Sequence, residues 1–357
     1  MSKLNVIGWD IGGAHLKAVL LDADGNLLNT LQTPCALWRG LDTLAFAIST
    51  VLNSFNINPH DAQHAITMTG ELVDLFPNRH TGVIEIAQLA ISLLGNNCQF
   101  YAANKGFVSM EQVAVSTSSI ASTNWYASAS LLAQYCPDAL LLDIGSTTSD
   151  IIAIESGKVL SSALSDASRL QQDTLVYTGI IRTPVMVLAQ KIVLTGVETN
   201  VMAEHFAAMA DVYRLTGELD NGADMAETAD GKGKTQLESA RRLARMVGFD
   251  VDDKPMNAWI ELAFSCRAIQ LKLLKNAILK HLKPNTPIIG AGAGSFLVKI
   301  LATELNCLYK SVNDLISAYP QHNRYPQALN VCFPAYAVAQ LSLQHDLKAI
   351  PLKVKSI

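Results

Sequence analysis

The sequence predicts an α/β fold made of two related halves. An Asp-Ile-Gly phrase occurs twice in the 357 residues, at residues 10–14 and 143–150, and each copy follows a short apolar run. A second β-rich run leaves each copy and ends in a tight reversal, at Asp24-Gly25 in the first half and Ser156-Gly157 in the second. Amphipathic helical segments and short apolar strands then alternate. We therefore expect two duplicated βββαβα halves.

The first half, residues 1–135, is expected to form one domain. Three strands make a meander, a helix follows with apolar residues at helical spacing, and a buried strand then ends in the turn that carries Glu71. The expected strands are residues 4–9, 17–22, 27–32, 65–68 and 100–103, and the expected helices are residues 41–52, 83–94 and the end of a Ser/Ala-rich stretch at residues 116–132.

The second half, residues 136–357, repeats the meander and then departs from it. A mostly helical stretch at about 196–260, with an acidic glycine-containing loop at residues 217–233, is expected to be an insertion in a position to cover a cleft. The last helix fits against either half. The expected strands are residues 139–142, 151–154 and 286–289, and the expected helices are residues 201–216, 236–247, 263–282, 296–305 and 335–347.

Composition narrows the class of protein. Half of the residues are hydrophobic, so the chain can bury two cores, and the formal net charge of -4 without a long Lys/Arg block argues against nucleic acid or an anionic membrane as partner. A phosphorylated small-molecule substrate is favoured, and homo-oligomer formation is left open. Asp10 interrupts the first apolar run, and no stretch approaches the roughly 18 apolar residues of a membrane span, so a cytoplasmic protein is expected. The six cysteines are scattered singly, which indicates buried thiols.

The glycine turns indicate phosphate binding. Such a turn exposes backbone N–H groups and brings a carboxylate beside them, which suits a phosphate and its Mg²⁺ ion. Two facing copies imply a cleft that holds a phosphorylated ligand from both sides, whereas the alternative is that both turns are plain hairpins. The predicted phosphate-binding residues are Asp10, Gly12, Gly13 and Lys17 in the first turn, Asp143, Gly145, Ser146, Thr147, Thr148 and Asp150 in the second, and Gly290, Gly292 and Gly294 in a later strand–turn–helix, with Asp10 and Asp143 as metal ligands.

These three turns, in this order, resemble those of the actin-like ATPase superfamily of sugar kinases, Hsp70 chaperones and actin. The phrase at residues 143–150 is most similar to the hydantoinase A and oxoprolinase branch. Further phrases resemble the hydantoinase A-like proteins of the tetrahydromethanopterin-linked one-carbon pathway, and they lie at residues 68–74, 177–184, 202–206, 211–218 and 241–246. The resemblance therefore implies a two-domain actin-like ATPase fold, related to ribonuclease H, over nearly the whole chain.

The resemblance also implies an activity. In archaea the family implies a synthase of methanofuran biosynthesis, which joins an aminomethylfuran-methyl diphosphate to the phenol of γ-glutamyltyramine and releases pyrophosphate. In methylotrophic bacteria it implies a methylofuran counterpart with a tyrosine-type acceptor. Superfamily relatives often carry a hydroxyl residue where the first turn has Ala14 and His15, so the second turn is expected to be the stronger clamp.

Chemistry of this kind indicates roles for several side chains. An unperturbed phenol has a pKa of about 10, so a general base helps, and Glu71 is the first candidate and Glu204-His205 the second. Arg182 suits bidentate contact with a diphosphate, and Lys17 adds a point charge. Each residue has a structural alternative: Glu71 as a cap of the following turn, His205 as a core or surface histidine, and Arg182 as part of a structural ion pair.

Two further stretches have an open interpretation. Residues 124–126, Asn-Trp-Tyr, fit helix packing better than substrate stacking. The basic residues Arg241, Arg242 and Arg245 fit a solvated helix face, although in a lid they would suit an anionic γ-glutamyl group.

Three classes of function follow. The first is the pyrophosphate-releasing transferase. The second is an ATP-dependent small-molecule kinase, or a hydantoinase-like ATP-dependent amidohydrolase, either of which would use ATP with Mg²⁺. Many sugar kinases present an Asp at the strand end before the interdomain link, where this chain has Asn104, and that argues against the kinase. The third is a nucleotide-dependent scaffold or sensor.

Overall fold

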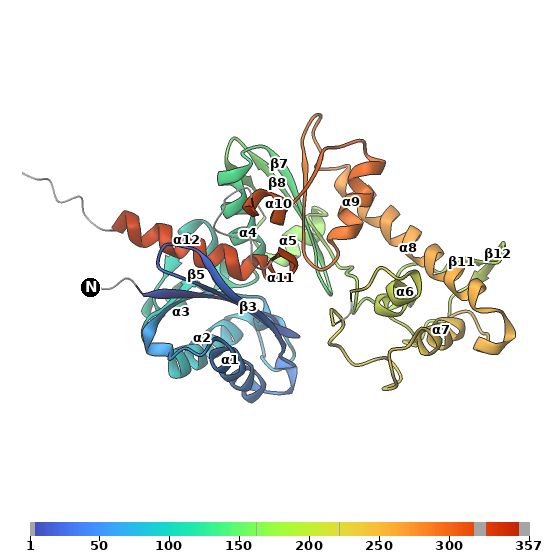
Figure 1. Cartoon of the computed structure of the whole chain (residues 1–357), viewed down its shortest axis with the longest axis horizontal. Coiled ribbons are helices and arrows are strands. Elements are labelled where there is room, and N and C mark those ends of the chain that lie inside the picture. The colour runs from blue at the N-terminus through green and yellow to red at the C-terminus, as the bar shows by residue number, and fades with distance from the viewer. Residues whose placement is uncertain (1–3, 162, 221, 318–325, 350–357) are drawn as a thin grey trace, which may run out of the picture. The chain divides into compact units, whose positions relative to one another are not determined.

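The computed structural model describes residues 4–161, 163–220, 222–317 and 326–349 (Figure 1). The chain forms two compact units, and each unit joins stretches that are distant in the sequence. Unit 1 comprises Met1–Ala139, Ile154–Arg169 and Ser311–Ile357, and unit 2 comprises Leu140–Ala153 and Leu170–Lys310.

Unit 1 is built on a six-stranded sheet with the strand order β3-β2-β1-β4-β5-β6. The first three strands form the expected antiparallel meander, and β4 and β5 join it in parallel, so the carboxyl ends of β1 and β4 lie at the same edge. The strands are β1 (Asn5–Ile11), β2 (His15–Leu21), β3 (Leu27–Pro34), β4 (Ala62–Met68), β5 (Cys98–Tyr101) and β6 (Phe107–Val108).

Helices complete the core of unit 1. The apolar face of α1 buries Leu44, Ile48 and Val51, as its helical spacing predicts. The C-terminal helix α12, red in Figure 1, packs against β1, β2, β4 and α4, which settles the half to which it belongs. The helices are α1 (Leu41–Phe55), α2 (Arg79–Leu94), α3 (Met110–Ile120), α4 (Asn124–Tyr135), α10 (Val312–Ser317), α11 (Pro326–Val331) and α12 (Phe333–Ala349), with 3-10 turns η1 (Leu37–Arg39), η2 (Pro59–Asp61), η3 (Gly70–Leu72) and η4 (Ala103–Lys105).

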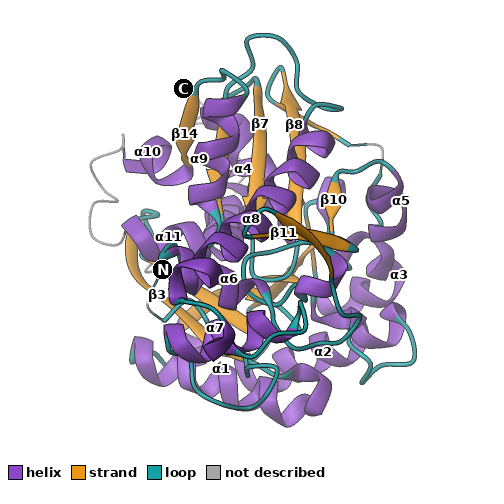
Figure 2. Ribbon diagram, turned by 90° about the vertical axis from the view of Figure 1, so that its right-hand side faces the viewer, coloured by secondary structure: helices purple, strands orange, loops and turns teal. Residues whose placement is uncertain are grey.

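Most of the second sheet, which has the order β10-β8-β7-β13-β14, lies in unit 2, and β9, whose residues belong to unit 1, pairs with β8 (Figure 2). Its central strand β7 is an almost uninterrupted apolar run and pairs in parallel with β13, as expected for a strand covered on both faces. The strands are β7 (Ala139–Ile144), β8 (Ser149–Glu155), β9 (Lys158–Leu160), β10 (Leu175–Val176), β13 (Ile288–Ala291) and β14 (Tyr309–Ser311).

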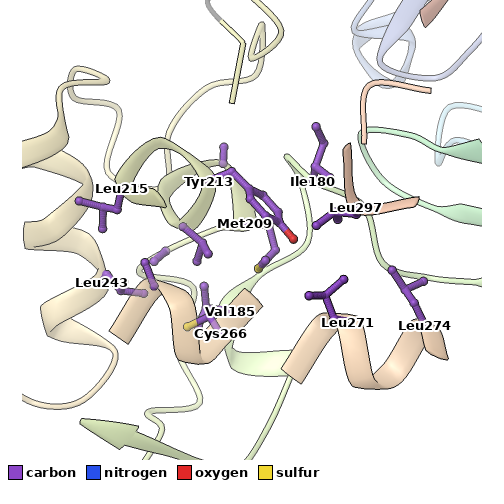
Figure 3. Packing of buried hydrophobic residues seen from close by; sticks show 14 of the residues in the cluster. Ile180, Val185, Met209, Tyr213, Leu215, Leu243, Cys266, Leu271, Leu274 and Leu297 are labelled. Carbon is purple, nitrogen blue, oxygen red and sulfur yellow. The ribbon is translucent and has the colours of Figure 1, made fainter. Parts of the chain in front are cut away.

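The helical insertion shares one hydrophobic core with the rest of unit 2. Figure 3 shows side chains from α6, α7, α8 and α9 meeting those of the loop that follows β10, with Tyr213, Leu243, Cys266 and Leu297 among them. The remaining elements are α5 (Asp166–Gln171), whose first turn belongs to unit 1, η5 (Val185–Val187), β11 (Lys191–Leu194), β12 (Val197–Asn200), α6 (Met209–Thr216), α7 (Gln236–Arg245), η6 (Val251–Asp253), α8 (Met256–Ile278) and α9 (Ser295–Glu304).

Three local expectations are corrected. The stretch expected to be helical from residue 201 begins its helix only at Met209, because β11 and β12 form a hairpin and a loop follows it. The Ser/Ala-rich stretch forms two helices, which break at Ser122, whose φ is 52°. Arg242 does not lie on a solvated face: it is fully buried, and its guanidinium contacts Asp211 at 2.7 Å and Asp230 at 3.0 Å.

The composition predicted buried cysteines and no membrane-spanning segment. Cys35, Cys98, Cys266 and Cys332 are buried, as predicted, and burial raises the pKa of the Cys266 thiol to about 12, whereas Cys136 and Cys307 are only partly buried. None of the described helices is long and apolar enough to cross a membrane.

Candidate functional site

The first Asp-Ile-Gly turn lies at the carboxyl end of β1. The backbone N–H of Gly12 donates to the carbonyl of His15 at 3.0 Å and closes the hairpin into β2. The Asp10 carboxylate is buried, and both of its oxygens have partners: Oδ2 lies 3.5 Å from Nζ of Lys17, and Oδ1 accepts from Asn124 at 3.4 Å. Burial raises the pKa of Asp10, and the Lys17 ammonium opposes this effect. Lys17 therefore neutralises Asp10 in this structure.

The phrase that carries Glu71 packs directly on the first turn. The N–H of Thr69 donates to the carbonyl of Ile11 at 2.9 Å, so β4 ends against the glycines and continues into η3. Glu71 is only 1% exposed. Its Oε1 accepts from the Ser122 hydroxyl at 2.7 Å, whereas Oε2 is buried without a hydrogen-bond partner among the described residues. Burial raises the pKa of Glu71 from 4.5 to about 7.

Three residues that sequence reasoning missed surround Glu71. Ser122 also lies within hydrogen-bond distance of Asp166 Oδ2, at 3.1 Å, and the same oxygen pairs with the Arg79 guanidinium at 2.7 Å. The Asp166 side chain is 15% exposed, so this chain of contacts leads from a buried carboxyl toward solvent. The break in the Ser/Ala-rich stretch is the one local feature that marks Ser122. Nothing local marks Asp166, because it comes from the start of α5.

Residues 177–184 contact the second glycine turn. Gly145 closes it with an N–H donated to the carbonyl of Thr148 at 2.9 Å, and the N–H of Arg182 donates to the carbonyl of Ser146 at 2.9 Å. Gly179 packs so tightly that a Cβ there would lie 2.5 Å from the backbone of Ser146. The phrase at residues 177–184 therefore follows the backbone of the second turn as the Glu71 phrase follows the first.

A buried hydrogen-bond network fixes the position of residues 177–184. Gln270 is fully buried on α8, and its Nε2 donates to the Thr178 hydroxyl at 2.7 Å and to the Gly179 carbonyl at 2.9 Å. Its Oε1 accepts from the Tyr213 hydroxyl. An adjoining pocket of about 330 Å³ is lined by Thr147, Tyr177, Arg182, Thr183, Pro184 and Val187. The predicted anion-binding Arg182 is exposed and lies at this pocket beside the second turn.

The third glycine turn also lies beside the second. Gly294 donates its N–H to the carbonyl of Ile144 at 2.8 Å. Gly292 has a φ of +80°, and a Cβ at this position would come within 2.4 Å of Asp143 Oδ1. The glycine thus leaves room for the Asp143 carboxylate at the end of β7. Thr147, Thr148 and Asp150 follow in the same turn and the first residues of β8.

The residues present fit Mg²⁺ at the second turn. No group of three or more His, Cys, Asp or Glu side chains that could hold a metal occurs in the described part of the chain. Mg²⁺ does not require such a group, because it is commonly held by one or two carboxylates, water and the phosphates of its ligand. Asp143, with the space left by Gly292 and the hydroxyls of the turn, has this donor chemistry. The Asp10 oxygens contact Lys17 and Asn124.

Glu204 and His205 do not lie on a helix. Both are exposed in the loop that precedes α6, so the helix on which they were expected is absent there. Their predicted catalytic role stays a prediction. Trp125, by contrast, is buried on α4, and the Arg169 guanidinium lies 4.0 Å from the centre of its ring, which fits a packing role.

Comparisons with known proteins identify relatives of this chain. An enzyme of Methanocaldococcus jannaschii, (4-{4-[2-(gamma-L-glutamylamino)ethyl]phenoxymethyl}furan-2-yl)methanamine synthase, is 30% identical over 351 residues, which cover 97% of this chain and 99% of the relative. A protein of the same name from Methanococcus vannielii is 30% identical over 216 residues, with coverage of 59% and 93%. Both names describe synthases, which supports an enzymatic activity for this chain.

A solved structure is similar in fold. The nucleotide-free structure of acetone carboxylase has a TM-score of 0.51 at 11% identity, covering 85% of this chain and 67% of that chain. The predicted two-domain actin-like ATPase fold is confirmed. A family model described as hydantoinase/oxoprolinase matches residues 63–319, a range that includes the Glu71 phrase and the second and third glycine turns. The chain therefore belongs to the hydantoinase/oxoprolinase family.

Proposed function

We propose that this protein is a synthase of methanofuran-type cofactor biosynthesis. It would join the phenol oxygen of a γ-glutamyltyramine-type or tyrosine-type acceptor to the methylene carbon of an aminomethylfuran-methyl diphosphate. A carbon–oxygen bond to the phenol forms, the bond from that carbon to the diphosphate breaks, and pyrophosphate leaves. The observation that carries the proposal is the match, over 97% of this chain, to an enzyme whose name describes a phenoxymethyl-furan product.

Glu71 is the proposed general base for the phenol. A phenol with a pKa of about 10 is a poor nucleophile at neutral pH until its proton is removed. The Glu71 carboxylate has one oxygen without a partner among the described residues and a pKa of about 7, so it is both able to accept a proton and matched to neutral pH. Its position beside the first glycine turn supports this role over that of a cap.

The glycine turns are proposed to bind the diphosphate. Backbone N–H groups of each turn and the exposed guanidinium of Arg182 are suitable donors for phosphate oxygens. When bound, Mg²⁺ supplies neutralisation of the negative charge on the leaving pyrophosphate, and we infer that Asp143 is one of its protein ligands. Lys17, which contacts Asp10, would supply a positive charge beside the phosphates.

Pyrophosphate release with defined substrates tests the proposal. The purified protein, Mg²⁺, the furan diphosphate and the phenolic acceptor should yield stoichiometric ether and pyrophosphate without ATP. Glu71→Gln should lower kcat by about 10²-fold or more, as loss of a general base does. Glu111→Gln, the same change at an exposed position of α3, is the matched control and should leave kcat unchanged. Acceptor phosphorylation coupled to ATP hydrolysis, with no ether formed, would replace this function by the kinase.

A further inference from the structure

Ser122 lies between two carboxyl groups. Its Oγ is 2.7 Å from Oε1 of Glu71 and 3.1 Å from Oδ2 of Asp166, both within hydrogen-bond distance. Ser122 occupies the break between α3 and α4 with a φ of 52°, so its backbone is held in an unusual conformation that aims the hydroxyl at both groups. The three residues come from three separate elements, since Glu71 lies in η3 and Asp166 begins α5.

A single hydroxyl hydrogen cannot serve two ionised carboxylates at once. Ser122 has one O–H to donate, so if both carboxyls were ionised, one short contact would bring two oxygens together with no hydrogen between them. The geometry is satisfied when one carboxyl holds a proton, donates it to Ser122 Oγ, and Ser122 donates its own hydrogen to the other. The three side chains therefore hold one shared proton in addition to the hydroxyl hydrogen of Ser122. In water at neutral pH, both carboxyls would be ionised and would hold no proton.

The surroundings decide which carboxyl holds that proton. Glu71 is 1% exposed and its second oxygen has no partner among the described residues. Asp166 is more exposed, at 15%, and its Oδ2 lies 2.7 Å from the Arg79 guanidinium. Burial is the largest cause that raises the pKa of Glu71, and the negative charge of Asp166 from α5 adds to it, whereas the Ser122 hydrogen bond and the Arg79 guanidinium from α2 oppose it. Glu71 is thus the protonated partner at rest below neutral pH.

We propose that Glu71, Ser122 and Asp166 form a proton-sharing triad, in which Ser122 passes the proton that Glu71 takes from its substrate to Asp166 and so to solvent. The inference rests on the proposed function, because it deepens the role of Glu71 as base. When Glu71 is ionised, the shared proton lies on Asp166, which first releases it to water. Glu71 Oε2 takes the phenol proton, and the carboxyl turns about Cγ–Cδ and gives this proton to Ser122 Oγ. The former Ser122 hydrogen moves to Asp166 Oδ2, which restores the starting arrangement. Charge and atoms balance, since one proton leaves for each phenolate that forms.

Titration of the Glu71 carboxyl tests the triad without any reaction. Protein labelled with ¹³C at glutamate Cδ is titrated by NMR, and the Glu71 resonance is assigned by its loss in Glu71→Gln. Ser122→Ala keeps the backbone conformation but removes a hydrogen bond to the ionised form, so the Glu71 pKa should rise by about one pH unit or more. Asp166→Asn removes a neighbouring negative charge, so the Glu71 pKa should fall. Opposite shifts are expected; unchanged midpoints, or shifts of the same sign, would overturn the triad.

The relay is then tested in turnover. Ser122→Ala should lower kcat about tenfold or more with KM nearly unchanged, and added imidazole, a small proton carrier, should restore part of the loss while leaving the wild type unaffected. A wild-type kcat in Ser122→Ala, or a loss that imidazole does not repair, would refute the relay while the base role of Glu71 stands. If the wild type forms no ether but the titration shifts are opposite, the proposed function fails and the triad remains.

Discussion

Replacement of Glu71 by glutamine should make the protein more stable at high pH. The Glu71 carboxyl has a pKa of about 7 in the folded protein and an ordinary value of 4.5. Between these values the folded state holds a proton that the unfolded state has released. By linkage, the folded state therefore loses stability as the pH rises from 4.5 to 7, and the loss is complete above 7. Glutamine does not titrate, so the variant escapes this loss.

The size of the effect follows from the two pKa values. Their difference of about 2.5, from 4.5 to 7, corresponds to about 3 kcal/mol of unfolding free energy, since one pKa unit is worth about 1.4 kcal/mol. The glutamine amide also changes the local hydrogen bonds with Ser122, but that cost does not depend on pH. The free energy of unfolding of the wild type is therefore subtracted from that of Glu71→Gln at each pH. The prediction concerns how much this difference grows between pH 4.5 and pH 8.

Urea unfolding at a series of pH values measures this difference. Asp10, whose pKa burial also raises, contributes to the pH dependence of both proteins and cancels in the comparison. The two stability curves should diverge by about 3 kcal/mol, with most of the divergence between pH 5 and 7. Parallel curves would show that Glu71 ionises at its ordinary pH, and the argument for a base matched to neutral pH would fail with them.

Three further changes probe the second turn and the insertion. Gly179→Ala should weaken pyrophosphate binding about tenfold or more by calorimetry while the circular dichroism spectrum is kept, because the new Cβ would displace the backbone at Ser146; unchanged affinity would contradict the packing. Asp143→Asn should remove the Mg²⁺ dependence of that binding, and a persistent dependence would place the ion elsewhere. Arg242→Met should cost about 3–5 kcal/mol in urea unfolding, because Asp211 loses its buried cation. A loss below 1 kcal/mol would mean that solvent screens the pair.

Local patterns in the sequence sufficed to predict most of the fold. The apolar runs and glycine turns predicted β1, β2 and β7 because strand period, burial and turn chemistry all act over a few neighbouring residues. The start of α6 was misjudged for the same reason: residues 201–208 have helical composition, but tertiary pairing in the preceding hairpin and loop outweighs that propensity.

The polar residues of the site were harder to predict because their partners are distant in sequence. Glu71 and Ser122 are 51 residues apart, and Ser122 and Asp166 are 44 apart, so no local pattern relates them. Arg242 was assigned to the surface because three arginines in a short helical run suggest a solvated face. Its true position depends on Asp211 and Asp230, whose carboxylates offset the cost of burying a guanidinium.

The placement of the family phrases explains how a general phosphate-binding fold acquires a particular chemistry. The glycine turns themselves are features of many relatives, whereas the 68–74 and 177–184 phrases are those by which the chain resembles its narrower group. Each of these phrases makes backbone hydrogen bonds to its own turn, at Ile11 in the first case and at Ser146 in the second. Side chains carried by these two segments are thereby positioned beside the turns. In this way a buried carboxyl, that of Glu71, is placed at the first turn, and an exposed arginine, Arg182, is placed at the second.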